Sequence, residues 1–164
     1  MVLGLLTASL LSIICFIVAI VKGLTIHGPA AVSQHVLWGF YATFLVTLAQ
    51  SMTMFYFIGT GKHVKDLVAH QPEGNEFIRR TKVFKAKVFP PALWAMLFTM
   101  TTMIIGGGVH THASWTPPWL HLGLAIVALY YNLVAFYRDA KYMIEHNMLM
   151  EEVEKRMVAS PASK

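Results

Sequence analysis

The sequence predicts an all-α integral membrane protein, a four-transmembrane-helix bundle with a cytoplasmic helical extension at its C-terminus. Three observations support this fold class. The chain is 56% hydrophobic and only 13% of its 164 residues are charged, whereas soluble proteins usually carry about a quarter charged residues. The apolar residues gather in four runs, each close to the roughly 20 residues that a helix needs to cross a bilayer. Almost all of the charge lies in two segments, one between the second and third runs and one after the fourth.

The four predicted spanning helices cover residues 2–21, 36–58, 88–105 and 119–137. We expect them to form one transmembrane domain, residues 1–140, followed by a cytoplasmic amphipathic helix and a short tail at 141–164. Glycine and proline residues lie between the runs, as is typical of segments that connect helices. Pro90 and Pro91 are expected in the first turn of the third helix, where a missing backbone N–H costs little.

The distribution of charge predicts the orientation of these helices. The segment 59–87 carries seven basic and three acidic residues, the tail from Arg138 carries five of each, and Lys22 is the one remaining charged residue. The two connecting segments on the opposite side, 23–34 and 109–118, contain no Asp, Glu, Lys or Arg. Because basic residues favour the cytoplasmic side, we expect both termini in the cytoplasm. Contact with anionic lipid headgroups accounts for the net charge of +5 without a nucleic-acid partner.

The sequence after the fourth run predicts that the helix continues into the tail. Tyr142, Leu149, Val153 and Met157 recur at helical spacing, and charged residues occupy positions between them. Such an amphipathic helix can dock on the basic segment, on lipid headgroups or on a partner protein. The pattern does not choose among these three surfaces.

No enzyme motif accompanies this architecture. The single Cys15 excludes an intrachain disulfide and CxxC redox or zinc-finger chemistry. The sequence contains no glycine-rich phosphate loop, no GxSxG and no HExxH. No ionisable residue is expected near the centre of a predicted span, which argues against a proton pump or an ion-coupled transporter. We therefore expect that the chain is not an enzyme by itself.

Histidines are numerous, eight in all, and five of them lie on the uncharged side. These five are His27 in the first outer loop, His35 at the start of the second predicted helix, His110 and His112 after the third, and His121 near the start of the fourth. Because the helix ends on one side meet when four helices pack, we expect several of these imidazoles to lie at a similar depth. The other three, His63, His70 and His146, are expected to be ordinary solvated residues.

Small and polar residues extend from two of the outer histidines at helical spacing. One stripe begins at His35 and the other at His121, and their further members are Gly39, Ala42, Thr43, Val46, Gln50 and Thr53 on the first and Ala125, Ala128, Asn132 and Ala135 on the second. Small and polar faces are typical of helix–helix contacts in membranes. We therefore expect His35 and His121 to point into the bundle, where they are candidate cofactor-binding residues.

A cluster of imidazoles without carboxylates favours particular ligands. Calcium and magnesium prefer oxygen ligands, whereas imidazole suits haem iron, copper and zinc. The sequence therefore predicts either haem b bound by His35 and His121, or a copper or zinc ion bound by His35, His110, His112 and His121. In outline the chain is similar to the small four-helix cytochrome b subunits that anchor redox enzymes, a resemblance that implies haem between helices. Histidines that bind haem usually lie several residues inside the membrane, however, whereas these are expected at its edge. That depth suits a metal ion at the helix ends better than haem.

Two functions from different classes follow. The first is a redox-associated membrane subunit in electron transport, which binds haem b or a transition-metal ion through its outer histidines. The alternative is a non-catalytic accessory or scaffold subunit of a larger membrane complex. In that case the histidines only cap helix ends, bond to loop carbonyls, or serve in proton relay or pH sensing. Both functions imply a lipid bilayer and either other membrane subunits or self-association as partners.

Overall fold

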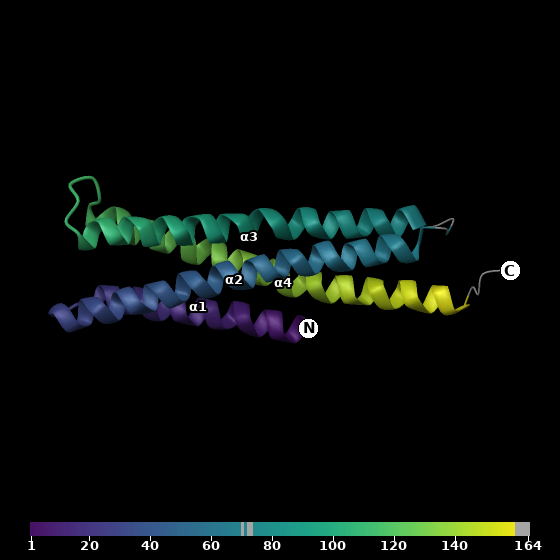
Figure 1. Cartoon of the computed structure of the whole chain (residues 1–164), viewed down its shortest axis with the longest axis horizontal. Coiled ribbons are helices and arrows are strands. Elements are labelled where there is room, and N and C mark those ends of the chain that lie inside the picture. Colours follow the sequence, from purple (N-terminus) through teal and green to yellow (C-terminus); the bar gives the residue numbers. More distant parts are fainter. Residues whose placement is uncertain (70, 72–73, 160–164) are drawn as a thin grey trace.

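A computed structural model of the chain describes residues 1–69, 71 and 74–159, with the backbone alone for 158 and 159. The described residues form four α-helices, which are α1 (Val2–Leu24), α2 (Pro29–Leu67), α3 (Gly74–His110) and α4 (Pro118–Ala159). Successive helices run antiparallel in one elongated bundle (Figure 1). We call the end that carries the α1–α2 and α3–α4 connections the histidine end, and the opposite end the charged end. His70 and the tail 160–164 lie outside the described residues.

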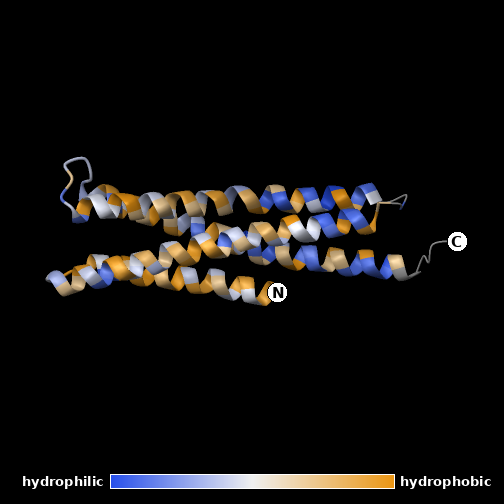
Figure 2. Cartoon of the chain, in the orientation of Figure 1, coloured by the Kyte–Doolittle hydropathy of each residue, from blue (hydrophilic) through white to orange (hydrophobic). Residues whose placement is uncertain are grey.

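The prediction of four helices that can cross a membrane is confirmed, since each is long and apolar enough to do so. Figure 2 shows hydrophobic residues along α1 and along the parts of the other helices nearest the histidine end, with hydrophilic residues toward the charged end. The 23 residues of α1 measure about 35 Å, close to the roughly 30 Å of a bilayer core. The other three helices, of 37 to 42 residues, extend about 20–30 Å further. This three-helix extension comprises residues 59–67, 74–87 and 138–159.

The prediction that residues 59–87 form a loop between two helices was wrong, because α2 continues to Leu67 and α3 begins at Gly74. For the same reason Pro90 and Pro91 lie inside α3 rather than in its first turn. A proline in a helix interior costs about 3 kcal/mol, whereas each large apolar side chain that becomes buried contributes about 1.5–3 kcal/mol. The continued α3 buries Phe77 and Phe84 among α2 and α4. This burial offsets the local cost of the prolines.

A core of large side chains holds the three-helix extension together. Phe57 and Val64 of α2, Phe84 of α3, and Leu149 and Val153 of α4 belong to one buried cluster. The sequence after the fourth run belongs to the same helix, because α4 continues through residue 140 without a break to Ala159. Of the three surfaces that the sequence left open, the α4 extension packs on the basic segment of this same chain.

Small side chains fill the bundle interior nearer the histidine end. Ala42 and Ala128 are buried in a cluster with Cys15 and Phe16, and Ala92 and Ala95 of α3 are fully buried. The inward members of both predicted stripes, among them Val46, Gln50, Ala125 and Asn132, are buried as expected. At the histidine end the helices lie in two hairpins, α1 with α2 and α3 with α4 (Figure 1).

The packing of the extension predicts different outcomes for two neighbouring substitutions. Leu149 is fully buried and Met148 is 65% exposed. We expect Leu149→Ala to lower the free energy of unfolding by about 2–5 kcal/mol, because it leaves a cavity in the core. Met148→Ala is the matched control, with an expected change of less than about 0.5 kcal/mol. Unfolding of the purified chain in mild detergent measures both, and equal effects would contradict the packing described here.

Candidate functional site

His35 of α2 and His121 of α4 form the one pair of outer histidines that the described structure shows in ring contact. Their ring centroids are 5.9 Å apart and the ring planes make an angle of 79°. Both side chains are half-buried. Since α2 begins at Pro29, His35 lies within the helix rather than at its start. The expectation that the second helix starts at His35 was therefore wrong.

Each of these rings is held by a hydrogen bond within its own hairpin. His35 Nδ1 lies 2.9 Å from the Ala19 carbonyl oxygen of α1, and His121 Nδ1 lies 3.1 Å from the Thr102 carbonyl oxygen of α3. A carbonyl oxygen only accepts, so Nδ1 carries the hydrogen in both rings. In a neutral imidazole this leaves Nε2 with a free lone pair. The same bond fixes the tautomer and orientation of histidines that bind metals.

A glycine lies against each ring. A Cβ atom added to Gly23 would be 2.8 Å from His35 Cε1, and one added to Gly106 would be 2.7 Å from His121 Cε1. Real Cβ atoms do not approach this closely, so a side chain at either position would displace the ring. In each hairpin the accepting carbonyl lies four residues before the glycine. The two hairpins therefore repeat one local arrangement of carbonyl, glycine and histidine.

The other outer histidines are arranged differently. His27, His110 and His112 are exposed, and His112 lies in the α3–α4 connection with a φ of 57°. Within the described ranges, no group of three or more His, Cys, Asp or Glu side chains could hold a metal ion. The structure thus brings together two of the four histidines predicted to bind copper or zinc, and it does not assemble a four-histidine site.

Two buried titratable residues escaped the sequence analysis. His146 was expected to be solvated but is fully buried in α4, because the helix continues and this face packs on α2. Asp139 is also fully buried. The signal that could have found them is spacing, since Asn132, Asp139 and His146 follow each other at intervals of seven residues. Asn132 belongs to the stripe already identified, and two further heptads reach the other two. His63, in contrast, is exposed as predicted.

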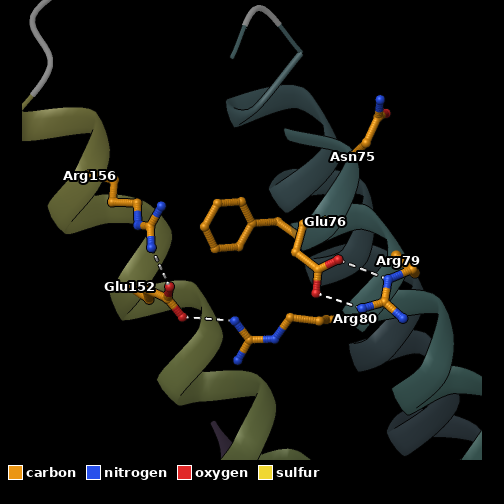
Figure 3. Close-up of a pocket in the computed structure, with 7 residues that line it drawn as sticks. Asn75, Glu76, Arg79, Arg80, Glu152 and Arg156 are labelled. Carbon is orange, nitrogen blue, oxygen red and sulfur yellow. Dashed lines mark hydrogen bonds and ion pairs between the residues drawn. The ribbon is translucent and has the colours of Figure 1, made fainter. Parts of the chain in front are cut away.

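A cavity of about 450 Å³ at the charged end lies between the start of α3 and the end of α4 (Figure 3). Arg79 donates two hydrogen bonds of 2.8 Å to Glu76, which lower the pKa of that carboxyl. Arg80 and Arg156 both reach Glu152, at 2.9 and 3.1 Å. Exposed ion pairs of this kind contribute little to stability. Because each of these guanidinium groups faces a glutamate, the cavity is a weaker candidate for an anion site than its arginines alone would indicate.

Comparisons with known proteins give no independent lead to a family. No protein-family model, no curated protein and no solved structure matches this chain. An inference about function therefore depends on the geometry of the His35–His121 pair and its surroundings.

Two adjacent glycines in α3 test the close contact beneath His121. Replacing glycine by alanine in a helix usually stabilises it by up to about 1 kcal/mol. We expect this gain for Gly107→Ala, since nothing lies within 4 Å of the added Cβ. Gly106→Ala should instead lower stability, because the ring of His121 must move away from the Thr102 carbonyl. Unfolding midpoints of the two variants in mild detergent measure the difference, and a gain for both would refute the contact.

Proposed function

We propose that this protein is a multi-pass membrane subunit that binds haem b between His35 and His121 and carries electrons. The observation that supports this function is the pair of imidazoles, each anchored through Nδ1, with ring centroids 5.9 Å apart. An imidazole nitrogen binds a metal at about 2 Å and the ring centre lies about 1 Å further, so two imidazoles on opposite sides of one ion have centres roughly 6 Å apart. The observed separation fits this value.

The number of ligands favours haem over a bare metal ion. Zinc sites take three or four protein ligands, and no such set exists among the described residues. Haem iron receives its equatorial ligands from the porphyrin, so the protein supplies the axial ones. When bound, haem supplies one-electron chemistry. His35 and His121 would hold it, Ala19 and Thr102 would fix the tautomer of the two rings, and Gly23 and Gly106 would leave the rings room.

We infer the membrane location and orientation from hydropathy and charge. The four apolar helices fit a bilayer, and the many basic residues of the charged end favour the cytoplasmic side. The haem would then lie near the outer face, and the three-helix extension would project into the cytoplasm. Other membrane subunits, or a second copy of this chain, are the proposed partners.

The alternative function is a non-catalytic accessory or scaffold subunit. The observation in its favour is the three-helix extension, which carries charged side chains beyond the apolar part of the bundle and buries Val64, Phe84 and Leu149 in its interior. An extension of this kind suits a docking role that needs no cofactor.

Spectroscopy of histidine variants tests the haem proposal. The full chain is produced with added haem and purified in mild detergent, and absorption is recorded in the oxidised and the dithionite-reduced state. We expect a Soret band with sharp reduced α and β bands, and at least a tenfold loss of bound haem in His35→Ala and in His121→Ala. The exposed His110→Ala and His112→Ala are matched controls that should retain haem.

Other outcomes would decide against haem. A native protein without a Soret band, or full haem content in the double variant His35→Ala/His121→Ala, would refute the proposed ligands. Elemental analysis of the same sample separates the remaining cases. Stoichiometric copper or zinc would favour a metal site, and a sample with neither haem nor metal would favour the accessory subunit.

A further inference from the structure

Three polar residues form a line along the buried face of α4. Asn132, Asp139 and His146 are each at most 1% exposed and are separated by seven residues, about 10.5 Å along the helix. We call them the α4 ladder. Facing it on α2 are further polar residues, of which Gln50 and Thr53 are also fully buried. Together these side chains make a polar seam between α2 and α4.

Most of the unpartnered buried polar atoms of the described chain lie on this seam. Gln50 Oε1, Thr53 Oγ1, both carboxyl oxygens of Asp139 and His146 Nδ1 have no hydrogen-bond partner in the described structure, and Ser9 Oγ of α1 is the one other such atom. Buried polar atoms nearly always have a partner, either protein or ordered water. Internal waters typically bridge groups of this kind. Internal waters along the seam would give these atoms partners.

The two ends of the ladder differ. Toward the histidine end, the Asn132 amide donates to Thr99 Oγ1 at 3.0 Å and to the Ala128 carbonyl at 2.8 Å. Toward the charged end, His146 Nε2 lies 2.8 Å from Thr60 Oγ1. The next residue, Gly61, lies against the half-buried ammonium group of Lys85. The seam thus reaches charged, hydrated side chains at one end and closes on a hydrogen-bonded amide at the other.

Among the described residues, no ion pair joins Asp139 to a cation that would compensate a negative charge. The stretches 2–21 of α1, 36–61 of α2 and 88–109 of α3 contain no Asp, Glu, Lys or Arg. The neighbouring Arg138 is half-buried and donates to the Lys87 carbonyl of α3. The Gln50 side chain approaches the carboxyl from α2, yet neither carboxyl oxygen completes a hydrogen bond within the described residues.

These surroundings favour the neutral carboxylic acid form of Asp139 over the carboxylate. A buried, unpaired carboxylate is strongly disfavoured. A protonated carboxyl has an O–H to donate, and Gln50 Oε1 is an acceptor without a partner. One hydrogen bond between them would satisfy an atom on each side.

We propose that Asp139 is a proton-binding site, protonated at rest and bonded to Gln50. Its proton exchanges with bulk water at the charged end through a file of internal waters past Thr53, Thr60 and His146. On release, the proton leaves the carboxyl oxygen for the adjacent water, and the water file and the Gln50 amide solvate the carboxylate that remains. The site does not depend on haem and exists in the cofactor-free chain.

The composition of the chain permits a direct test, because Asp66 and Asp139 are its two aspartates. The full chain is labelled with ¹³C at the aspartate carboxyl carbon and studied in detergent by isotope-edited infrared spectroscopy. In Asp66→Asn the label reports on Asp139 alone, and in Asp139→Asn it reports on the exposed Asp66. At about pH 6, roughly two units above the ordinary aspartate pKa of about 3.9, we expect the acid carbonyl band from Asp139 and the carboxylate band from Asp66. An ionised Asp139 in the folded Asp66→Asn protein would overturn the proposal.

Access along the seam is tested by transfer to D₂O. The acid band of Asp139 should shift well before the amide bands of the helices, because water reaches the carboxyl. Thr53→Val, made in the Asp66→Asn background, should slow this shift at least tenfold while the band itself remains. Thr47→Val is the matched control, since Thr47 donates to Thr43 of its own helix, and it should leave the rate unchanged. Exchange as slow as that of the helical amides, or equal rates in both valine variants, would rule out the water file.

Discussion

Close contact between helices at small residues is the constraint on which the rest of this structure depends. Lipid gives helices no hydrophobic reason to associate, so van der Waals packing and interhelical hydrogen bonds must hold them. The buried alanines of the bundle interior, including Ala42, Ala95 and Ala128, allow this contact. Gly23 and Gly106 carry it furthest, because the absence of Cβ lets an imidazole lie on the backbone and reach a carbonyl one turn earlier. Both histidine anchors depend on these two positions.

The charged end is built on a different principle. Its core consists of Phe57, Phe84, Met143, Leu149 and similar large residues. In the proposed orientation this end lies in water, where burial of large apolar side chains supplies the stabilisation. The surface ion pair between Arg80 and Glu152 joins α3 to α4 but contributes little to stability. The polar seam connects the two parts, and most of the unpartnered buried side-chain atoms of the described residues lie in it.

Much of this fold is predictable from the sequence, because hydropathy and helical periodicity report which faces are buried. The four spans, both small-residue stripes and the amphipathic end of α4 follow from such patterns. The lengths of α2 and α3 do not, since local signals such as Pro90 and Gly59 oppose a helix that only tertiary burial of Phe77 and Phe84 stabilises. The approach of His35 to His121 also depends on how two hairpins pack, a relation between distant residues. Asp139 was overlooked because it adjoins Arg138 in the sequence. Only the packing of α4 shows that the Asp139 side chain is buried in the bundle, whereas Arg138 lies nearer the surface.

Because His35 and His121 belong to different hairpins, binding of a ligand to both rings would stabilise the association of the two hairpins. A ligand that bound both rings would add its binding free energy to the association of the α1–α2 and α3–α4 halves, by RT ln(1 + [L]/Kd), or about 2.7 kcal/mol at a free concentration a hundred times Kd. Neither half could retain such a ligand alone. Chains that had not acquired it would have the weaker interface and would be the first that membrane proteases remove, since small losses of stability change cellular abundance several-fold. The supply of the ligand would then set how much of the protein a cell keeps.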